Sequence, residues 1–189
     1  DYPIVKIGSQ WWMGKNVNAT LYANGAPVSY YNYNNDTAYG TVYGKLYTWA
    51  AAMNGAASSD SIPSGVQGVC PMGWHLPGDA EWTVLTDSLG GETAAGGKLK
   101  ETDTTHWASP NTGATNSSGF TALPGGYRYT DGSFYDVGSY GSWWTASESS
   151  ATDAWGRYLL YNNAQVYRGN YGKAYGFSIR CVKDIDLFV

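Results

Sequence analysis

The sequence has little charge and no concentrated positive charge. Only 14% of its 189 residues are charged, and the 11 Lys and Arg residues are scattered along a chain of net charge −4. Proteins that bind nucleic acid gain much of their affinity from clustered Lys and Arg side chains. No apolar run approaches the ~20 residues of a membrane span. We therefore expect no nucleic-acid partner and no direct membrane insertion by this part of the chain.

Histidine and cysteine are equally scarce. The chain has two of each, and no group of them has the spacing of a zinc site. No catalytic motif surrounds His75 or His106, so we expect both to be structural. Cys70 and Cys181 are either two buried thiols or one long-range disulfide. We favour the disulfide, because low charge with many Asn, Thr, Ser and Gly residues suits an exported protein.

The aromatic residues are abundant and unusual in kind. The chain has 17 Tyr and 9 Trp but only 4 Phe. Tyr and Trp are favoured where a ring contacts protein on one side and water or a ligand on the other. Two interpretations stay open, a Tyr-rich sheet that only stabilises the fold and a binding surface.

The length suits a single domain over residues 1–189. The chain begins without Met and without a signal peptide, which favours a mature or trimmed fragment of a longer secreted or anchored protein.

The residue pattern predicts an N-terminal hairpin, then helices before residue 107, and a run of strands after residue 120. Residues 1–20 are typical of a hairpin, 24–44 of a long ordered loop, and 46–56 of a helix. A second helix should begin near Asp79 and end at Gly90-Gly91, and 93–107 should be a short helical or extended piece. Beyond these, we expect a hairpin turn at Asp131-Gly132, a turn at 161–164 and a final strand over 175–183. This order predicts an α+β fold with an antiparallel sheet.

Asp79 and Glu81 could be read as a catalytic acid and base. Two residues apart at a helix start, however, they point in different directions. Helix capping explains Asp79 more simply, and we expect Glu81 to bond backbone or an arginine. No nucleophile elbow, GxGxxG or P-loop spacing is present.

Four motifs occur in a fixed order along the chain. They are WHLPGDAEWTVL (74–85), LPGGYRYTDGSF (123–134), WWTAS (143–147) and YGFSIRCVKD (175–184). Together with IGSQWWMGKNVN (7–18), they resemble the Fibrobacter succinogenes major paralogous domain family over nearly the whole chain. The resemblance implies a C-type lectin-like fold with two helices, short-stranded mixed or antiparallel sheets and long ordered loops. It also implies a location on the bacterial cell surface or outside the cell.

The segments LPGDAEW (76–82) and YGFSIR (175–180) are also similar to the frame of the formylglycine-generating enzyme superfamily. The copper-binding cysteine pair of that enzyme is not matched, since residues 166–176 contain no cysteine. The resemblance therefore implies the fold and argues against enzyme activity.

Calcium-dependent lectins of this fold carry EPN or QPD and WND tripeptides, which this sequence lacks. We expect no resident cofactor, with a structural calcium as an open alternative. Its ligands would be loop oxygens, for which the loop carboxylates are Asp131, Asp136, Glu148 and Asp153.

The resemblance places the ligand face in the C-terminal region, where Tyr and Asn concentrate. We expect aromatic stacking and oriented hydrogen bonds to a protein or glycan on another cell or host surface. The expected contact residues are Trp155, Arg157, Tyr161, Asn163, Tyr167, Arg168, Asn170, Tyr171 and Tyr175. Strand alternation should turn about half of the side chains in this region inward.

The pattern over 144–175 is also compatible with the variable segment of a diversity-generating retroelement target, in which mutated adenines in Asn codons yield Tyr, Ser, Asp and Gly. The leading hypothesis is thus an extracellular ligand-binding or adhesion domain. The alternatives are a structural module of a surface or pilus assembly, and a carbohydrate-active enzyme that would need converging loop carboxylates.

Overall fold

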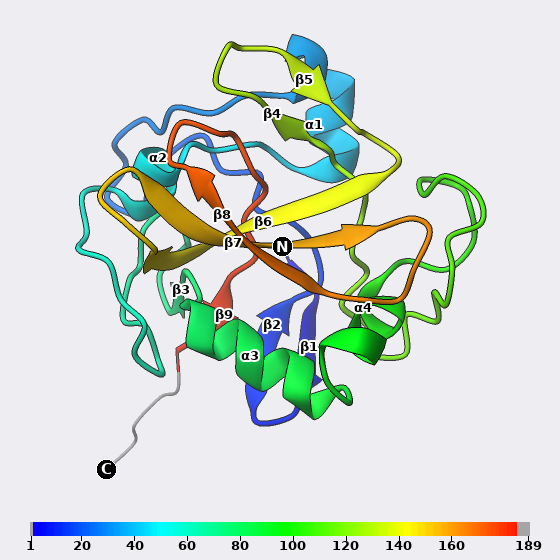
Figure 1. The fold of residues 1–189 in the computed structure, drawn as a ribbon. Helices are drawn as coiled ribbons and strands as arrows, with labels where there is room; N and C mark the ends of the chain where they lie inside the picture. The colour runs from blue at the N-terminus through cyan, green and yellow to red at the C-terminus, as the bar shows by residue number, and fades with distance from the viewer. Residues whose placement is uncertain (1, 185–189) are drawn as a thin grey trace.

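The computed structural model describes residues 2–184 and folds them into three β-sheets and four α-helices (Figure 1). The strands are β1 (Ile4–Ile7), β2 (Gln10–Met13), β3 (Trp74–His75), β4 (Tyr127–Arg128), β5 (Phe134–Tyr135), β6 (Tyr140–Glu148), β7 (Asp153–Leu160), β8 (Tyr167–Gly172) and β9 (Val182–Lys183). The helices are α1 (Thr37–Tyr43), α2 (Trp49–Met53), α3 (Asp79–Ser88) and α4 (Glu92–Leu99), with a short 3₁₀ turn η1 (Tyr33–Asn35) before α1. All strand pairs are antiparallel, so the predicted α+β class is confirmed. The finer assignment to the C-type lectin-like fold stays a prediction.

The central element is the three-stranded sheet β6-β7-β8. Figure 1 shows it crossing the middle of the molecule, with α3 and α4 on one side and α1 with the β4–β5 hairpin on the other. The predicted turn at 161–164 connects β7 to β8, and the predicted Asp131-Gly132 turn connects β4 to β5. Gly132 has a φ of +96°, a conformation that favours glycine.

The two ends of the described chain meet in the four-stranded sheet, whose order is β1-β2-β9-β3. β1 and β2 form the predicted N-terminal hairpin. Val182 of β9 pairs with Trp12 on one side and His75 on the other. Beside this sheet Cys70 and Cys181 form a disulfide with a Cα–Cα distance of 6.0 Å, which confirms the favoured pairing.

The core consists of two apolar clusters on opposite sides of β6. Trp144 packs into the cluster that contains Tyr47 and the disulfide, whereas its neighbour Trp143 packs into the cluster that contains Trp82 and Phe120. Successive side chains of a strand point to opposite faces, so two adjacent tryptophans anchor one strand to both clusters.

The segment 176–182 runs between the same two clusters. Phe177, Ile179 and Cys181 belong to one cluster and Val182 belongs to the other. This segment is not the single continuous strand predicted over 175–183. It forms isolated bridges to three separate segments, at Tyr47, Arg128 and Trp143, before it enters β9. A segment that changes partners in this way cannot keep one ladder register.

The prediction of a loop over 24–44 and of two helices was incomplete, because α1 forms within that loop. Its sequence TAYGTVY has Gly and β-branched residues and no apolar period, so its helix propensity is low. Asp36 caps it, since the Asp36 side chain accepts a hydrogen bond from Ala38 N. Packing of Tyr39 and Tyr43 rings, with centroids 6.0 Å apart, further stabilises it.

The helix predicted at Asp79 is α3, but the capping residue differs. Gly78 is the N-cap, and its N–H donates to Glu81 Oε2 at 3.0 Å. Asp79 is the first helical residue and instead binds arginines. The piece predicted over 93–107 is helical only as far as Leu99. None of the helices in residues 2–184 has the length and hydropathy of a membrane-spanning segment.

Candidate ligand-binding site

The sheet β6-β7-β8 presents different side chains on its two faces. Side chains alternate along each strand, and the register places Tyr158 opposite Tyr167 and Arg157 opposite Arg168. One face, called here the tyrosine face, carries Tyr140, Ser142, Tyr158, Tyr167 and Tyr171. The other, called the arginine face, carries Trp143, Trp155, Arg157, Arg168 and Asn170.

The tyrosine face holds a pocket of about 240 Å³. Strands β6, β7 and β8 supply part of its wall, β4 supplies one ring, and the stretch after β8 supplies two more. The lining residues are Tyr127, Tyr140, Ser142, Tyr158, Tyr171, Tyr175 and Phe177. None of them carries a charge at neutral pH, so the pocket suits a neutral ligand group.

Tyr158 lies at the centre of this aromatic group. Its ring stacks on Tyr167, with centroids 4.8 Å apart and planes 10° apart, and on Tyr140 at 6.0 Å and 22°. Tyr171 meets it edge-on at 6.3 Å, and Tyr175 in turn lies 5.8 Å from Tyr171. Such contacts fix ring orientation, so the pocket wall is held in place by its own rings.

Two glycines allow the rings to lie directly on the sheet. Gly156 and Gly169 are paired across β7 and β8. A Cβ at Gly169 would lie 2.8 Å from the Tyr171 hydroxyl oxygen, and one at Gly156 would lie 3.2 Å from the Phe177 ring. The floor of the tyrosine face is therefore bare backbone, and any side chain there would displace a ring.

Burial raises the pKa of two phenols that line the pocket, Tyr127 and Tyr171. It raises the pKa of Tyr127 to about 12, and the charge of nearby Asp136 acts in the same direction. Burial is also the main reason why the pKa of Tyr171 lies well above its ordinary value, and the neighbouring Tyr158 raises it further. Protonated phenols both donate and accept hydrogen bonds, so the pocket offers rings and hydroxyls together.

The nine expected contact residues divide among three places. Tyr171 and Tyr175 line the pocket, and Tyr167 supports it by stacking on Tyr158. Trp155, Arg157, Arg168 and Asn170 lie on the arginine face instead. The remaining two, Tyr161 and Asn163, lie beyond the end of β7.

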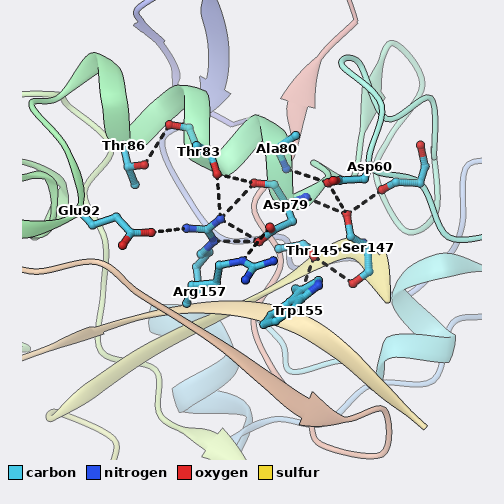
Figure 2. Close-up of polar contacts among 12 residues, drawn as sticks. Asp60, Asp79, Ala80, Thr83, Thr86, Glu92, Thr145, Ser147, Trp155 and Arg157 are labelled. Atoms are coloured by element: carbon cyan, nitrogen blue, oxygen red, sulfur yellow. Dashed lines mark hydrogen bonds and ion pairs between the residues drawn. The ribbon is translucent and has the colours of Figure 1, made fainter. Parts of the chain in front are cut away.

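Arg157 is inside the protein rather than at a surface. It is only 1% exposed, and its Nη2 donates to Asp79 Oδ1 at 2.8 Å (Figure 2). Its Nη1 donates to Glu92 Oε1 at 3.2 Å, and Thr83 Oγ1 accepts from Nη2 at 3.1 Å. Buried against α3 with its donors occupied, Arg157 has no group free for an external ligand.

Arg168 binds the same carboxylate, that of Asp79, but is itself partly exposed to solvent. Its Nε donates to Asp79 Oδ2 at 2.8 Å, and its guanidinium carbon lies 3.3 Å from the centroid of the Trp155 ring. Arg168 therefore covers Trp155, while Asn170 is exposed beside it. Together the arginines of β7 and β8 attach the sheet to the first turn of α3.

Tyr161 and Asn163 belong to the β7–β8 turn. The Tyr161 carbonyl accepts from Thr112 N at 2.8 Å, and the Asn163 side chain accepts from Gln165 N at 2.9 Å. The buried ammonium of Lys100 donates to the Asn163 carbonyl at 2.9 Å. These contacts give the turn a structural role.

Comparison with known protein families gives a match over nearly the whole chain. The model of the Fibrobacter succinogenes major domain family matches residues 5–183.

The chain belongs to this family.

The resemblance stated from the four motifs is thus confirmed. Searches of curated proteins and of solved structures found no match to the chain.

In this member of the Fibrobacter succinogenes major domain family, the motif at 74–85 organises the fold. His75 Nε2 lies 2.8 Å from Glu81 Oε1, and His75 Nδ1 lies 2.7 Å from Asp184 Oδ1. Burial alone lowers the pKa of His75, but the hydrogen bonds and charges of the two carboxylates raise it above the ordinary value. Glu81 also accepts from Ser64 N at 3.1 Å, so this group ties α3 to β3 and to the loop before it.

Some residues that line the pocket of this family member are not among the nine expected contact residues, namely Tyr127, Tyr140, Ser142 and Phe177. Tyr158 is not among them either, although it lies within the Tyr-rich segment. Alternation along 140–158 is the signal that could have found Tyr140, Ser142 and Tyr158. No local signal indicates Tyr127 or Phe177, because they arrive from other segments.

The loop carboxylates of this family member do not gather in one place. Glu148 pairs with Lys173 at 2.7 Å and Asp153 accepts from Thr152 Oγ1 at 2.6 Å, both near the β6–β7 turn. Asp131 lies in the β4–β5 turn, where it accepts from Ser133 N. Within residues 2–184, no three His, Cys, Asp or Glu side chains are arranged to hold a metal ion.

Proposed function

We propose that this domain is a non-enzymatic, extracellular ligand-binding or adhesion module of C-type lectin-like architecture, and that its ligand docks on the tyrosine face. The observation that carries the proposal is the uncharged pocket of about 240 Å³ lined by six aromatic rings and one serine. Concave sites with rigid aromatic walls and a few polar groups are typical ligand sites. The disulfide fits an oxidising, extracellular setting.

The pocket favours binding over catalysis. Its lining offers phenols, one alcohol and a phenyl ring, and the raised pKa values of Tyr127 and Tyr171 leave their hydroxyls protonated at neutral pH. General acid–base catalysis works best with a group whose pKa lies near the working pH. Ring stacking with hydrogen-bonding hydroxyls instead suits a sugar face or an aromatic side chain of a protein partner.

The test is a glycan array, followed by titration of the best ligand against single variants. Tyr158→Ala removes the central ring and should weaken binding at least tenfold, that is, by about 1.4 kcal/mol or more. Tyr158→Phe keeps the stacking and should weaken binding less.

Trp155→Ala is the matched control, because Trp155 lies on the same strand but on the arginine face. It should bind at full strength. Equal loss for Trp155→Ala and Tyr158→Ala would assign the site to neither face and remove the proposal. Near-ultraviolet circular dichroism of each variant checks that the fold is retained.

A second proposal concerns diversification of the same face by a retroelement. The segment 144–175, whose composition suggested a variable region, supplies Tyr158, Tyr171 and Tyr175 to the pocket. The encoding locus should then contain a reverse transcriptase and an adenine-variant repeat of this segment. Absence of both eliminates this proposal and leaves the binding proposal unchanged.

A further inference from the structure

A second cavity, of about 460 Å³, lies away from the tyrosine face. Its wall comes from the segment after β2, from the end of α1 and from residues 101–123, and Arg180 lies at its base. We call it the Arg180 cavity. Its lining includes Lys15, Asn16, Tyr43, Glu101, His106 and Thr121. Its size is that of a small-molecule site.

Arg180 carries a buried positive charge that no carboxylate within residues 2–184 neutralises. The residue is 1% exposed, and Asn16 Oδ1 accepts from its Nε at 3.1 Å and its Nη2 at 2.8 Å. Backbone carbonyls of Met13 and Phe120 accept from Nη1. All these acceptors are neutral. Arg157, by contrast, is buried to the same degree but is paired with two carboxylates.

None of the ion pairs found within residues 2–184 includes Arg180. Its pKa is lowered to about 9 by burial alone. A buried charge is ordinarily paired, because leaving it unpaired is costly. The site therefore lacks the negative charge that would compensate Arg180.

The other ionisable groups of the cavity leave it open to an anion. Lys15 is exposed at the rim. Glu101 is the one acidic residue among the described lining residues, and its Oε2 is already paired with His106 Nδ1 at 2.7 Å. The same contact orients the imidazole, whose Nε2 has no hydrogen-bond partner among residues 2–184. Lys15 can therefore donate to a ligand, and His106 lies in the wall of the same cavity.

Thr121, in the wall of the cavity, has an unusual backbone conformation. Its φ is +52°, which is rare for a β-branched residue. Asn116 binds it twice, at the backbone N–H and at the hydroxyl. Backbone strain of this kind persists only where surrounding contacts enforce it, and it concentrates at binding sites.

We infer that the Arg180 cavity binds a sugar-sized anion that bears a carboxylate or a sulfate ester. Lys15 Nζ donates to the anionic group. Arg180 acts through its charge rather than by direct contact, because its N–H groups are occupied. The amide of Asn18 and the hydroxyl of Thr41 suit the hydroxyls of an acidic monosaccharide. This site is separate from the tyrosine face and does not rest on the function proposed for it.

The experiment follows the ring protons of the two histidines by NMR, with His106→Gln assigning the signals. The probes are glucuronate and N-acetylglucosamine 6-sulfate, with glucose as the neutral match, all at constant ionic strength. The acidic sugars should shift the His106 signal in a saturable way and leave His75 unchanged, whereas glucose should shift neither. Raising the salt concentration should weaken binding.

Lys15→Ala should weaken the binding of the acidic sugars by about two- to fivefold. The control is Lys6→Ala, which removes the same charge from an exposed position on β1 and should leave binding unchanged. Tyr158→Ala should also leave it unchanged, which separates this site from the tyrosine face. The inference is overturned if glucose and glucuronate shift His106 equally, if neither acidic sugar shifts it, or if Lys15→Ala and Lys6→Ala behave alike.

Discussion

Replacing Asp79 with Ala should destabilise the fold far more than replacing Glu92 with Ala, although both carboxylates bind Arg157. Asp79 is 7% exposed and Arg157 is 1% exposed. Asp79 accepts from Arg157 Nη2 and from Arg168 Nε, each at 2.8 Å. Without Asp79, the buried Arg157 keeps only the exposed Glu92 as a counter-charge. Breaking a buried pair in this way costs about 3–5 kcal/mol.

The magnitude expected for Glu92 is much smaller. Its side chain is 55% exposed, and its oxygen lies 3.2 Å from Arg157 Nη1. Water screens an ion pair of this kind, so Glu92→Ala should cost less than about 1 kcal/mol. Arg168 is 38% exposed, and its bond to Asp79 should likewise add little. The predicted difference therefore comes almost entirely from Arg157.

The assay is equilibrium unfolding in urea, followed by tryptophan fluorescence with the disulfide kept oxidised. The double variant Asp79→Ala/Arg157→Met removes both charges and should recover part of the loss. If Asp79→Ala and Glu92→Ala lie within 1 kcal/mol of each other, Arg157 is not the buried, carboxylate-dependent anchor described above.

Three further predictions concern the rest of the fold. Reducing the disulfide between Cys70 and Cys181, which are 111 residues apart, should lower the free energy of unfolding by about 4–5 kcal/mol, measured by urea unfolding with and without dithiothreitol. His75 has a raised pKa in the folded state. Its protonation therefore stabilises the fold fully below its ordinary pKa of 6.5, and this contribution is lost as the pH rises through the folded-state pKa. In unfolding experiments over a pH series, the free energy of unfolding of His75→Gln should lack this decline. Gly68 and Gly55 both have positive φ, but only a Cβ at Gly68 would clash, 2.1 Å from a backbone oxygen. Gly55→Ala should therefore cost about 1–2 kcal/mol and Gly68→Ala at least about 1 kcal/mol more; equal costs would contradict the packing at Gly68.

Local signals in the sequence were enough to predict much of the fold. The α3 helix follows from apolar periodicity and a Gly-Gly stop, and the β4–β5 turn follows from Asp131-Gly132. In contrast, α1 could not be predicted, because its own residues disfavour a helix and its stability comes from Asp36 and from packing. The final segment could not be predicted in detail either, since its bridges depend on distant partners.

The same distinction applies to the candidate site. Composition located the Tyr-rich segment, and strand alternation implied that its side chains would divide between two faces. Deciding that Trp155 and Tyr158 lie on opposite faces requires the strand bounds and register. Recognising that Arg157 is buried requires Asp79, which is 78 residues away. Tyr127 and Phe177 reach the pocket only through tertiary packing.

The position of segment 176–182 has a consequence for how the protein is made. Val182 lies in the middle of a sheet whose other strands are formed by far earlier residues, and Phe177 lines the pocket of the tyrosine face. Sheet closure must therefore wait until nearly all of the described chain has been synthesised, and contacts between such distant segments slow folding. A nascent chain that stops at residue 175 has every tyrosine of the pocket but lacks Phe177 and the closing strand. The complete pocket of the tyrosine face can therefore form only after synthesis has passed this point.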